Sequence, residues 1–331
     1  MHDPISWIFV GGVLAVLTAT TLLGQVMNRR AESGLSPAVM ATFSRRVWAW
    51  WLLMMVLAAA LFVPPWVTVT IFFLLSFWAL REFITLTPTR MGDHRALFWV
   101  FVLFTPAQYV LVGMGGDYYP LYSIVIPVYG FLFVPARVAF SGDPKRFLER
   151  TAKIQAGLLV CVYCLSFAPA LLDLKIEDFN GDAWTDNSLL LFYFVFMVQI
   201  GDALQYAWEK LMGRTVIAPH ISPNKTWEGF LGGVGSTALV GGALWWATPF
   251  NHWQAALMSL VIAVMGFAGV MCMSAVKRDR GVKDYGTLVV GHSGVLDRLD
   301  SLCFAAPVFY HLTKFFFTDF FTKLSQAAIA V

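Results

Sequence analysis

Apolar residues occur along this chain in long runs, and short polar stretches separate one run from the next. Most runs reach the ~20 residues that a helix needs to cross the hydrocarbon layer of a membrane. The pattern therefore predicts an all-α, polytopic integral membrane protein with nine to ten transmembrane helices. We place the spanning segments at approximately 5–27, 47–63, 66–84, 96–113, 118–140, 152–174, 188–211, 230–250, 253–274 and 301–321.

Prolines or charged residues lie at or near the ends of three of these segments. The second and third meet at Pro64-Pro65 and form either a tight helical hairpin or a single re-entrant unit. At the end of the third segment, Arg81 and Glu82 either pair with each other or lie at the membrane interface. The outer half of the last segment is expected to leave the membrane, because it contains His311, Lys314 and Asp319.

The composition agrees with a lipid environment. Hydrophobic residues make up 58% of the chain and charged residues 13%, against roughly 25% charged residues in soluble domains. All four cysteines fall within apolar segments, where a thiol behaves as a small hydrophobic group rather than as part of a disulfide framework. We expect no nucleic-acid partner, because the placement of the basic residues has another explanation.

That explanation is membrane topology. Twenty of the 23 lysines and arginines fall on alternate connections between the predicted segments, and short cytoplasmic loops are enriched in these residues. Both termini are then expected outside and the basic connections in the cytoplasm, in a bacterial inner (plasma) membrane. The first segment is expected to be a retained helix, because the residues before it lack the positive charge of a signal peptide.

Polar residues that topology does not explain begin after position 190. We therefore divide the chain into N-terminal transmembrane helices (1–190), as a scaffold with lipid access, and a C-terminal catalytic region (191–331). Asp202 lies inside a predicted spanning segment, where an aspartate costs about 2.5–3.5 kcal/mol or more and usually faces a partner, a water-filled cavity or an ion. Alternatively, it is an interfacial carboxylate satisfied by neighbouring polar side chains on its own helix.

The loop that follows, Ser222-Pro223-Asn224-Lys225-Thr226, offers two hydroxyls, an amide and an ammonium group. Such a set suits a polyphosphate at the N-terminus of the next helix, although an ordinary turn fits as well. The order of residues is not that of a Walker loop.

The stretch 277–300 concentrates charge, with nine charged residues among 24. Its basic cluster consists of Lys277, Arg278, Arg280 and Lys283, and its acidic residues include Asp284, Asp297 and Asp300. A positive-inside loop explains the bases but not the three aspartates. Aspartates beside bases are expected if Mg²⁺ lies between the carboxylates and a phosphate. His292, between glycines, is either structural or a ligand.

Three motifs in this region resemble one family. The pattern Ser274-x-x-Lys277-Arg278, Lys283-Asp284 and His292-x-Gly294-x-x-Asp297-Arg298-x-Asp300 is similar to the C-terminal signature of CDP-diacylglycerol synthases, also called phosphatidate cytidylyltransferases. The Ser222–Gly229 loop and the helix with Asp202, Tyr206 and Gly213-Arg214 resemble the two preceding motifs. The chain departs from the family pattern at Val290, at Ser293, where a second glycine is typical, and at Trp208-Glu209, where smaller residues are frequent.

The resemblance implies transfer of a cytidylyl group from CTP to phosphatidate at the lipid bilayer, by a homodimer that uses Mg²⁺ and has room for a second ion. The predicted metal ligands are Asp202, Asp297 and Asp300. The predicted catalytic residues are Asp297, Asp300, Lys283, Asp284 and His292. The predicted substrate-binding residues are Ser222, Asn224, Lys225, Thr226, Lys277, Arg278 and Arg298. The alternatives are a CTP-dependent lipid kinase, a transferase for another lipid phosphate, a non-catalytic relative, and a transporter that uses Asp202.

Overall fold

The computed structural model describes residues 11–12, 18, 21, 63–86, 89–178, 182–285 and 294–318. The predicted segments 5–27 and 47–63 lie almost wholly outside these residues, and so do Val290, His292, Ser293 and Asp319.

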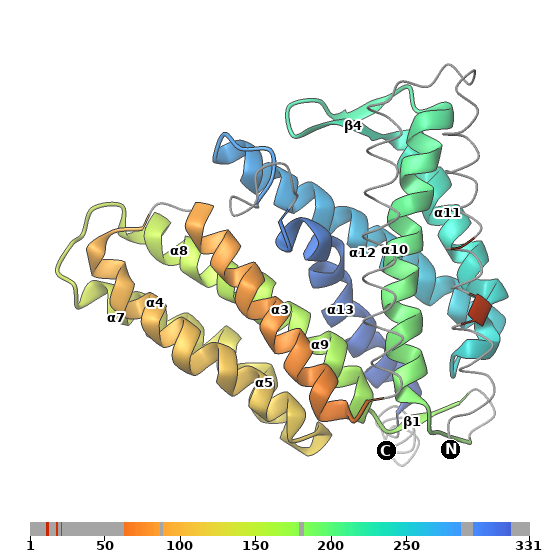
Figure 1. Ribbon diagram of the computed structural model, residues 1–331, viewed down its shortest axis with the longest axis horizontal. Helices are drawn as coiled ribbons and strands as arrows, with labels where there is room; N and C mark the ends of the chain where they lie inside the picture. The colour runs from red at the N-terminus through yellow and green to blue at the C-terminus, as the bar shows by residue number, and fades with distance from the viewer. Residues whose placement is uncertain are drawn as a thin grey trace, which may run out of the picture.

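Each of the other eight predicted segments corresponds to a helical element (Figure 1). Five are single helices: α3 (Pro65–Leu86), α10 (Asn187–Met212), α11 (Trp227–Ala243), α12 (His252–Asp279) and α13 (Leu296–Phe317). Three are composite. The first comprises η1 (Met91–Asp93), α4 (His94–Trp99), η2 (Val100–Phe104) and α5 (Thr105–Gly113). The second comprises η3 (Gly116–Tyr118), α6 (Tyr119–Ile124), η4 (Val125–Gly130) and α7 (Phe131–Ala139). The third comprises α8 (Phe147–Leu158), η5 (Leu159–Cys164), α9 (Leu165–Ala170) and η6 (Leu171–Asp173).

Six of these eight elements are long and apolar enough to cross a membrane, namely α3, the three composite helices, α10 and α12. The protein is therefore an all-α integral membrane protein. Of the remaining two elements in the described ranges, α11 has only 17 residues and α13 contains four charged residues. The described part of the chain thus supports six spans, fewer than the nine to ten predicted from the whole sequence.

Helix α11 ends at Ala243, seven residues earlier than predicted, because the chain turns there. A 3-10 turn, η7 (Trp245–Ala247), follows, and Thr248 before Pro249 is extended, as expected for a residue that precedes proline. The next helix then begins with a capping box between Asn251 and Gln254. The predicted apolar run is therefore divided by a proline turn.

The composite helices contain π-helical turns near prolines. Pro127 lies within η4, and Pro106 directly follows η2. Proline has no backbone N–H, so the helical hydrogen-bond ladder is interrupted there. Beside Pro106, the Thr105 hydroxyl donates to the carbonyl of Val100 at 2.8 Å. The buried Thr105 hydroxyl thus has its partner within its own helix, as a polar group in a membrane span requires.

Two short hairpins connect helices. β1 (Ile176–Glu177) pairs antiparallel with β2 (Ala183–Trp184) between η6 and α10. β3 (Val216–Ala218) pairs antiparallel with β4 (Ser222–Thr226), with Val216 opposite Thr226. The Ser-Pro-Asn-Lys-Thr stretch, for which an ordinary turn was one interpretation, is therefore a strand.

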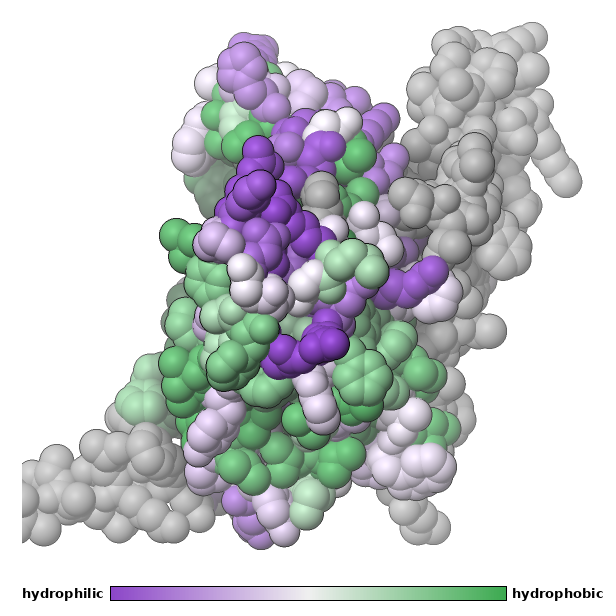
Figure 2. All heavy atoms as spheres, turned by 90° about the vertical axis from the view of Figure 1, so that its left-hand side faces the viewer, coloured by the Kyte–Doolittle hydropathy of each residue, from purple (hydrophilic) through white to green (hydrophobic). Residues whose placement is uncertain are grey.

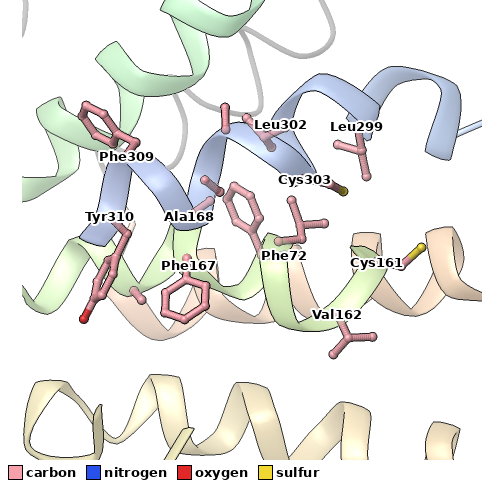
Figure 3. Packing of buried hydrophobic residues seen from close by; sticks show 14 of the residues in the cluster. Phe72, Cys161, Val162, Phe167, Ala168, Leu299, Leu302, Cys303, Phe309 and Tyr310 are labelled. Carbon is pink, nitrogen blue, oxygen red and sulfur yellow. The ribbon is translucent and has the colours of Figure 1, made fainter. Parts of the chain in front are cut away.

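Helix α13 is central to the core. It packs against α12 and α10 on one side and against α3, η5 and α9 on the other. Figure 3 shows Cys303 and Tyr310 of α13 in one packed cluster with Phe72 of α3 and Phe167 of α9, and the rings of Phe167 and Tyr310 lie 5.0 Å apart. One core thus joins elements from both sides of position 190, and the predicted division into two regions stays a prediction.

Small residues let α10 and α11 approach closely. A Cβ added at Gly232 would lie 2.5 Å from Cδ2 of Trp208, and one at Gly233 would lie 2.8 Å from the backbone N of Gln205. These glycines therefore serve helix packing. They also provide the space for Trp208, the large residue at which the chain departs from the family pattern.

One end of the molecule, here called the basic end, brings together residues 82–95, 137–153, 209–229, 277–285 and 294–298. Long-range contacts join these segments, for example Arg278 Nε to the carbonyl of Ile221 at 3.1 Å. In Figure 1 this end lies at the top, where α10, α12 and α3 end and α13 and α8 begin. Figure 2 shows hydrophilic residues gathered over the same end, above a broad hydrophobic surface. Fifteen of the 20 lysines and arginines on the predicted cytoplasmic connections lie in these segments.

Candidate active site

A partly buried carboxylate junction lies where α10 meets α13. The Ser301 hydroxyl donates to Oδ2 of Asp202 at 2.7 Å, and the Ser301 backbone N–H donates to Oδ1 of Asp300 at 2.8 Å. Asp300 is only 6% exposed. One serine therefore holds two carboxylates together, although they are 98 positions apart in the sequence.

Close packing fixes the position of α13 at this junction. A Cβ added at Gly269 of α12 would lie 2.4 Å from the backbone carbonyl oxygen of Asp300. A contact this short is possible only for glycine, so the α12 backbone lies directly against α13. The carboxylate of Asp300 thus has little freedom to move away from Asp202.

Asp297 faces different partners, although it lies only one turn from Asp300. Its Oδ1 pairs with Nζ of Lys277 at 2.7 Å, and its Oδ2 accepts the backbone N–H groups of Tyr285 at 2.8 Å and Gly294 at 3.0 Å. Residues 285 and 294 flank the positions outside the described ranges. One ammonium group and two backbone donors therefore already occupy the Asp297 carboxylate.

The strand β4 brings a second lysine to the basic end. Lys225 Nζ pairs with Oε1 of Glu209 at 2.9 Å, and the Glu209 side chain is 5% exposed. The ammonium group of Lys225 also lies 5.8 Å from the ring centroid of Phe267 on α12. Asp202 lies near enough to both members of this pair to be affected by their charges. Glu209, a departure from the family pattern, thus holds one of the predicted substrate-binding residues.

Side chains already occupy much of the N-terminus of α11. Thr226 Oγ1 accepts the backbone N–H of Gly229 at 3.1 Å. Glu228 accepts the backbone N–H groups of Arg214 and Thr215, and these hydrogen bonds lower the pKa of Glu228 to about 2. Thr226 therefore acts as a helix cap here, and the predicted anion site at this N-terminus would have to form around these contacts.

The remaining predicted residues are more peripheral. Arg278 donates to the carbonyls of Ile221 and Val282 and so ties the β3–β4 hairpin to the end of α12. Exposed positions include Asn224, Lys283, Asp284 and Arg298, whereas Ser222 is partly buried. Within the described ranges, none of these side chains has an ion pair with Asp202 or Asp300. The structure thus brings Asp202 and Asp300 together, with Lys225 and Lys277 nearby, while His292 lies outside the described residues.

The junction of Asp202 and Asp300 has one feature that suits a hard cation such as Mg²⁺, although three ligands from the described part of the chain do not meet there. Within the described residues, no three His, Cys, Asp or Glu side chains converge on one point, so the predicted triad of Asp202, Asp297 and Asp300 is not assembled. However, Mg²⁺ in nucleotide sites is commonly held by one or two carboxylates together with substrate phosphates and water. Two neighbouring carboxylates, bound only by the hydroxyl and the backbone N–H of one serine, match that requirement, because their charges need compensation.

Two functional positions were missed from the sequence. Ser301 is the bridge in the carboxylate junction, yet nothing marks it except its place after Asp300. Glu82 does not pair with Arg81: it is 6% exposed and accepts backbone N–H groups of Val295 and Leu296. Arg81 instead lies 5.3 Å from the ring centroid of Trp78. The sequence feature that could have indicated a special role for Glu82 is the presence of an acidic residue in a mostly apolar segment.

Comparison with known proteins agrees with the geometry. A model described as "Cytidylyltransferase family" matches residues 43–316. The Escherichia coli protein YnbB, described as uncharacterized, is 37% identical over 91% of this chain and 97% of its own length. A phosphatidate cytidylyltransferase of Synechocystis sp. is 40% identical over 43% of this chain and 51% of its own length. A phosphatidate cytidylyltransferase of Aquifex aeolicus is 39% identical over 44% of this chain and 54% of its own length. The matches to these two enzymes thus span about half of each.

Proposed function

Since this chain belongs to the cytidylyltransferase family, we propose that it transfers the cytidylyl group of CTP to phosphatidate. The products are CDP-diacylglycerol, for phospholipid biosynthesis, and pyrophosphate. The partial matches to phosphatidate cytidylyltransferases support phosphatidate as the acceptor. The protein that matches along nearly the whole chain has no described activity, so the acceptor depends on the site itself.

The Asp202–Ser301–Asp300 junction is the observation that carries this proposal. Its two carboxylates lie at the same end of the molecule as two lysines from different elements, Lys225 on β4 and Lys277 on α12. A site that joins CTP to a lipid phosphate must compensate many negative charges at once. A transporter that used Asp202 would have no need for this set of lysines and carboxylates at one end of the molecule.

The reaction requires little proton transfer. An oxygen of the phosphatidate phosphate, already anionic, forms a bond to the α-phosphorus of CTP, while the bond to the bridging oxygen breaks and pyrophosphate leaves. Catalysis is then mainly positioning and charge neutralisation. Asp202 and Asp300 would hold Mg²⁺, which supplies positive charge between the carboxylates and the CTP phosphates. Lys225, Lys277 and Arg278 would bind phosphate oxygens, and Asp297 would have to exchange Lys277 for the ion to become a metal ligand.

The site must lie where both substrates can reach it. CTP arrives from water and phosphatidate from the leaflet, so we place the basic end at the cytoplasmic face of a bacterial inner membrane. Twenty of the 23 basic residues belong to connections assigned to that face, which supports this orientation. A homodimer remains the expected assembly.

The decisive assay combines purified protein in detergent or vesicles with CTP, Mg²⁺ and phosphatidate. We expect equal amounts of pyrophosphate and CDP-diacylglycerol, and no product without Mg²⁺. Pyrophosphate without liponucleotide would exclude the synthase assignment. Release of CDP with a newly phosphorylated lipid would instead identify a lipid kinase, and a lack of CTP consumption would favour a transporter or a non-catalytic relative.

The Lys225–Glu209 pair provides a second test within the same assay. If the Lys225 ammonium binds the triphosphate, Lys225→Met should raise the KM for CTP roughly 10- to 100-fold, the value of one charge-assisted hydrogen bond. Glu209→Gln should leave that KM unchanged or lower it, because it removes the group that competes for the lysine. Equal increases in both variants would mean that the ion pair acts only as a structural unit.

A further inference from the structure

We infer that Glu82 of α3 is a positioning residue for the active site, because its carboxylate holds the first turn of the helix that carries Asp297 and Asp300. The inference rests on the proposed function for its effect on catalysis, but its structural part can be measured separately.

The contact between Glu82 and α13 is bidentate. Oε1 accepts the backbone N–H of Val295 at 3.1 Å, and Oε2 accepts that of Leu296 at 2.8 Å. The first N–H groups of a helix have no partners within the helix, and no side chain from the α13 N-cap residue, Val295, supplies one. A residue 213 positions earlier in the chain therefore provides the cap.

The location of this carboxylate argues against an incidental contact. Glu82 is 6% exposed and lies within α3, one of the six apolar spans. Burial of a carboxylate there is costly. The positive end of the α13 dipole and the two N–H groups offset that cost, and the indole N–H of Trp78 also donates to Oε1 at 3.2 Å.

Glu82 and Asp297 act on the same short segment. Asp297 Oδ2 accepts the backbone N–H of Gly294, the residue directly before the two that Glu82 binds. Two carboxylates thus hold three successive N–H groups at the start of α13. Gly269 of α12 already limits sideways movement of this helix at Asp300. Glu82 adds the restraint at its N-terminal end, so that the N-terminal half of the chain determines where Asp300 meets Asp202.

The cap at the start of α13 also affects how CTP can bind. Helix N-termini are common sites for phosphate, but a carboxylate already occupies this one. The phosphates of CTP must therefore be bound by lysines, arginines and a cation rather than by the first turn of α13.

The test uses the full-length protein and the variant Glu82→Gln. The amide keeps the shape of the side chain but loses its charge and places an NH₂ group against a backbone N–H. Without any ligand, we expect faster hydrogen–deuterium exchange of the amides of residues 294–300, and unchanged exchange in residues 213–229. In the CTP and phosphatidate assay, we expect turnover to fall roughly 10- to 100-fold, the range for small misplacements of catalytic groups, and the Mg²⁺ concentration for half-maximal turnover to rise.

Glu149→Gln is the matched control, because Glu149 is a partly exposed glutamate of α8 at the same end of the molecule. It should change neither measurement. If Glu82→Gln cannot be purified in folded form, Trp78→Phe replaces it. That variant removes only the indole donor to Glu82 and should produce the same changes with a smaller amplitude.

The outcomes separate this inference from the proposed function. Unchanged exchange at 294–300 overturns the inference. A loss of turnover without a change in exchange or in the Mg²⁺ requirement also overturns it, because a general loss of stability would have that effect. If the wild-type protein makes no CDP-diacylglycerol, the proposed function fails, while the exchange measurement still decides whether Glu82 holds α13.

Discussion

Replacement of Asp300 by asparagine is expected to reduce CDP-diacylglycerol formation roughly 100- to 1000-fold, the range seen when one preorganised charge-stabilising group is lost from an active site. The variant keeps the shape of the side chain and the acceptor for the Ser301 backbone N–H. It removes one of the two adjacent negative charges at the junction with Asp202. The measurement is the initial rate at saturating CTP and phosphatidate across a range of Mg²⁺ concentrations.

The same substitution should not destabilise the fold. Two carboxylates side by side repel each other, and functional sites are often less stable than a neutral replacement would be. We therefore expect the thermal midpoint of Asp300→Asn to equal or exceed that of the wild type. Asp279→Asn is the control, because Asp279 is an exposed aspartate at the end of α12, paired with Arg280. Turnover of Asp300→Asn within threefold of the wild type would exclude the junction as the catalytic centre.

The second large effect concerns stability rather than catalysis. Arg150 on α8 is 4% exposed and binds Asp93, which is 1% exposed, with Nε at 2.9 Å from Oδ1. Nη1 of Arg150 also donates to the carbonyls of Asp143 and Lys145. Removal of one member of a buried ion pair costs about 3–5 kcal/mol, because it leaves an uncompensated charge. Arg150→Met should therefore destabilise the protein by about that amount, measured by denaturation in detergent micelles.

Two comparisons make this prediction specific. Lys153→Met removes the other ion pair of α8, in which the partner Glu149 is 42% exposed, and exposed pairs contribute roughly 0–1 kcal/mol. The double variant Arg150→Met with Asp93→Leu should lose less stability than Arg150→Met alone, because no buried charge is left without a partner. If Arg150→Met costs no more than Lys153→Met, the network is not important for the stability of this end of the molecule.

Membrane topology gives only a partial explanation of Arg150. As one of the basic residues on alternate connections, it was explained by membrane topology alone. Its partner Asp93 is 57 positions away, and nothing in the local pattern marks the two as a pair. The same holds for Glu82 and the first turn of α13. Charge counts predict on which side of a membrane a residue lies, but not which groups it contacts.

The sequence by itself determined the class of the protein and the approximate position of eight helices, and it singled out Asp202 and Asp300 as candidate site residues. Long apolar runs must form helices in lipid, because every backbone polar group then has a partner inside its own segment. An aspartate inside such a run, Asp202, marks a functional position because it is costly there. These inferences use only local composition and spacing, which the chain contains explicitly.

The tertiary structure decided which of the charged groups meet. Asp297 and Asp300 lie three positions apart, yet one faces Lys277 and the other joins Asp202 through Ser301. The capping of α13 by Glu82 depends on how α3 packs against it. Such contacts arise from the burial of apolar helix faces and from close approach at residues such as Gly269, so they depend on distant parts of the chain and leave no periodic signal in the sequence.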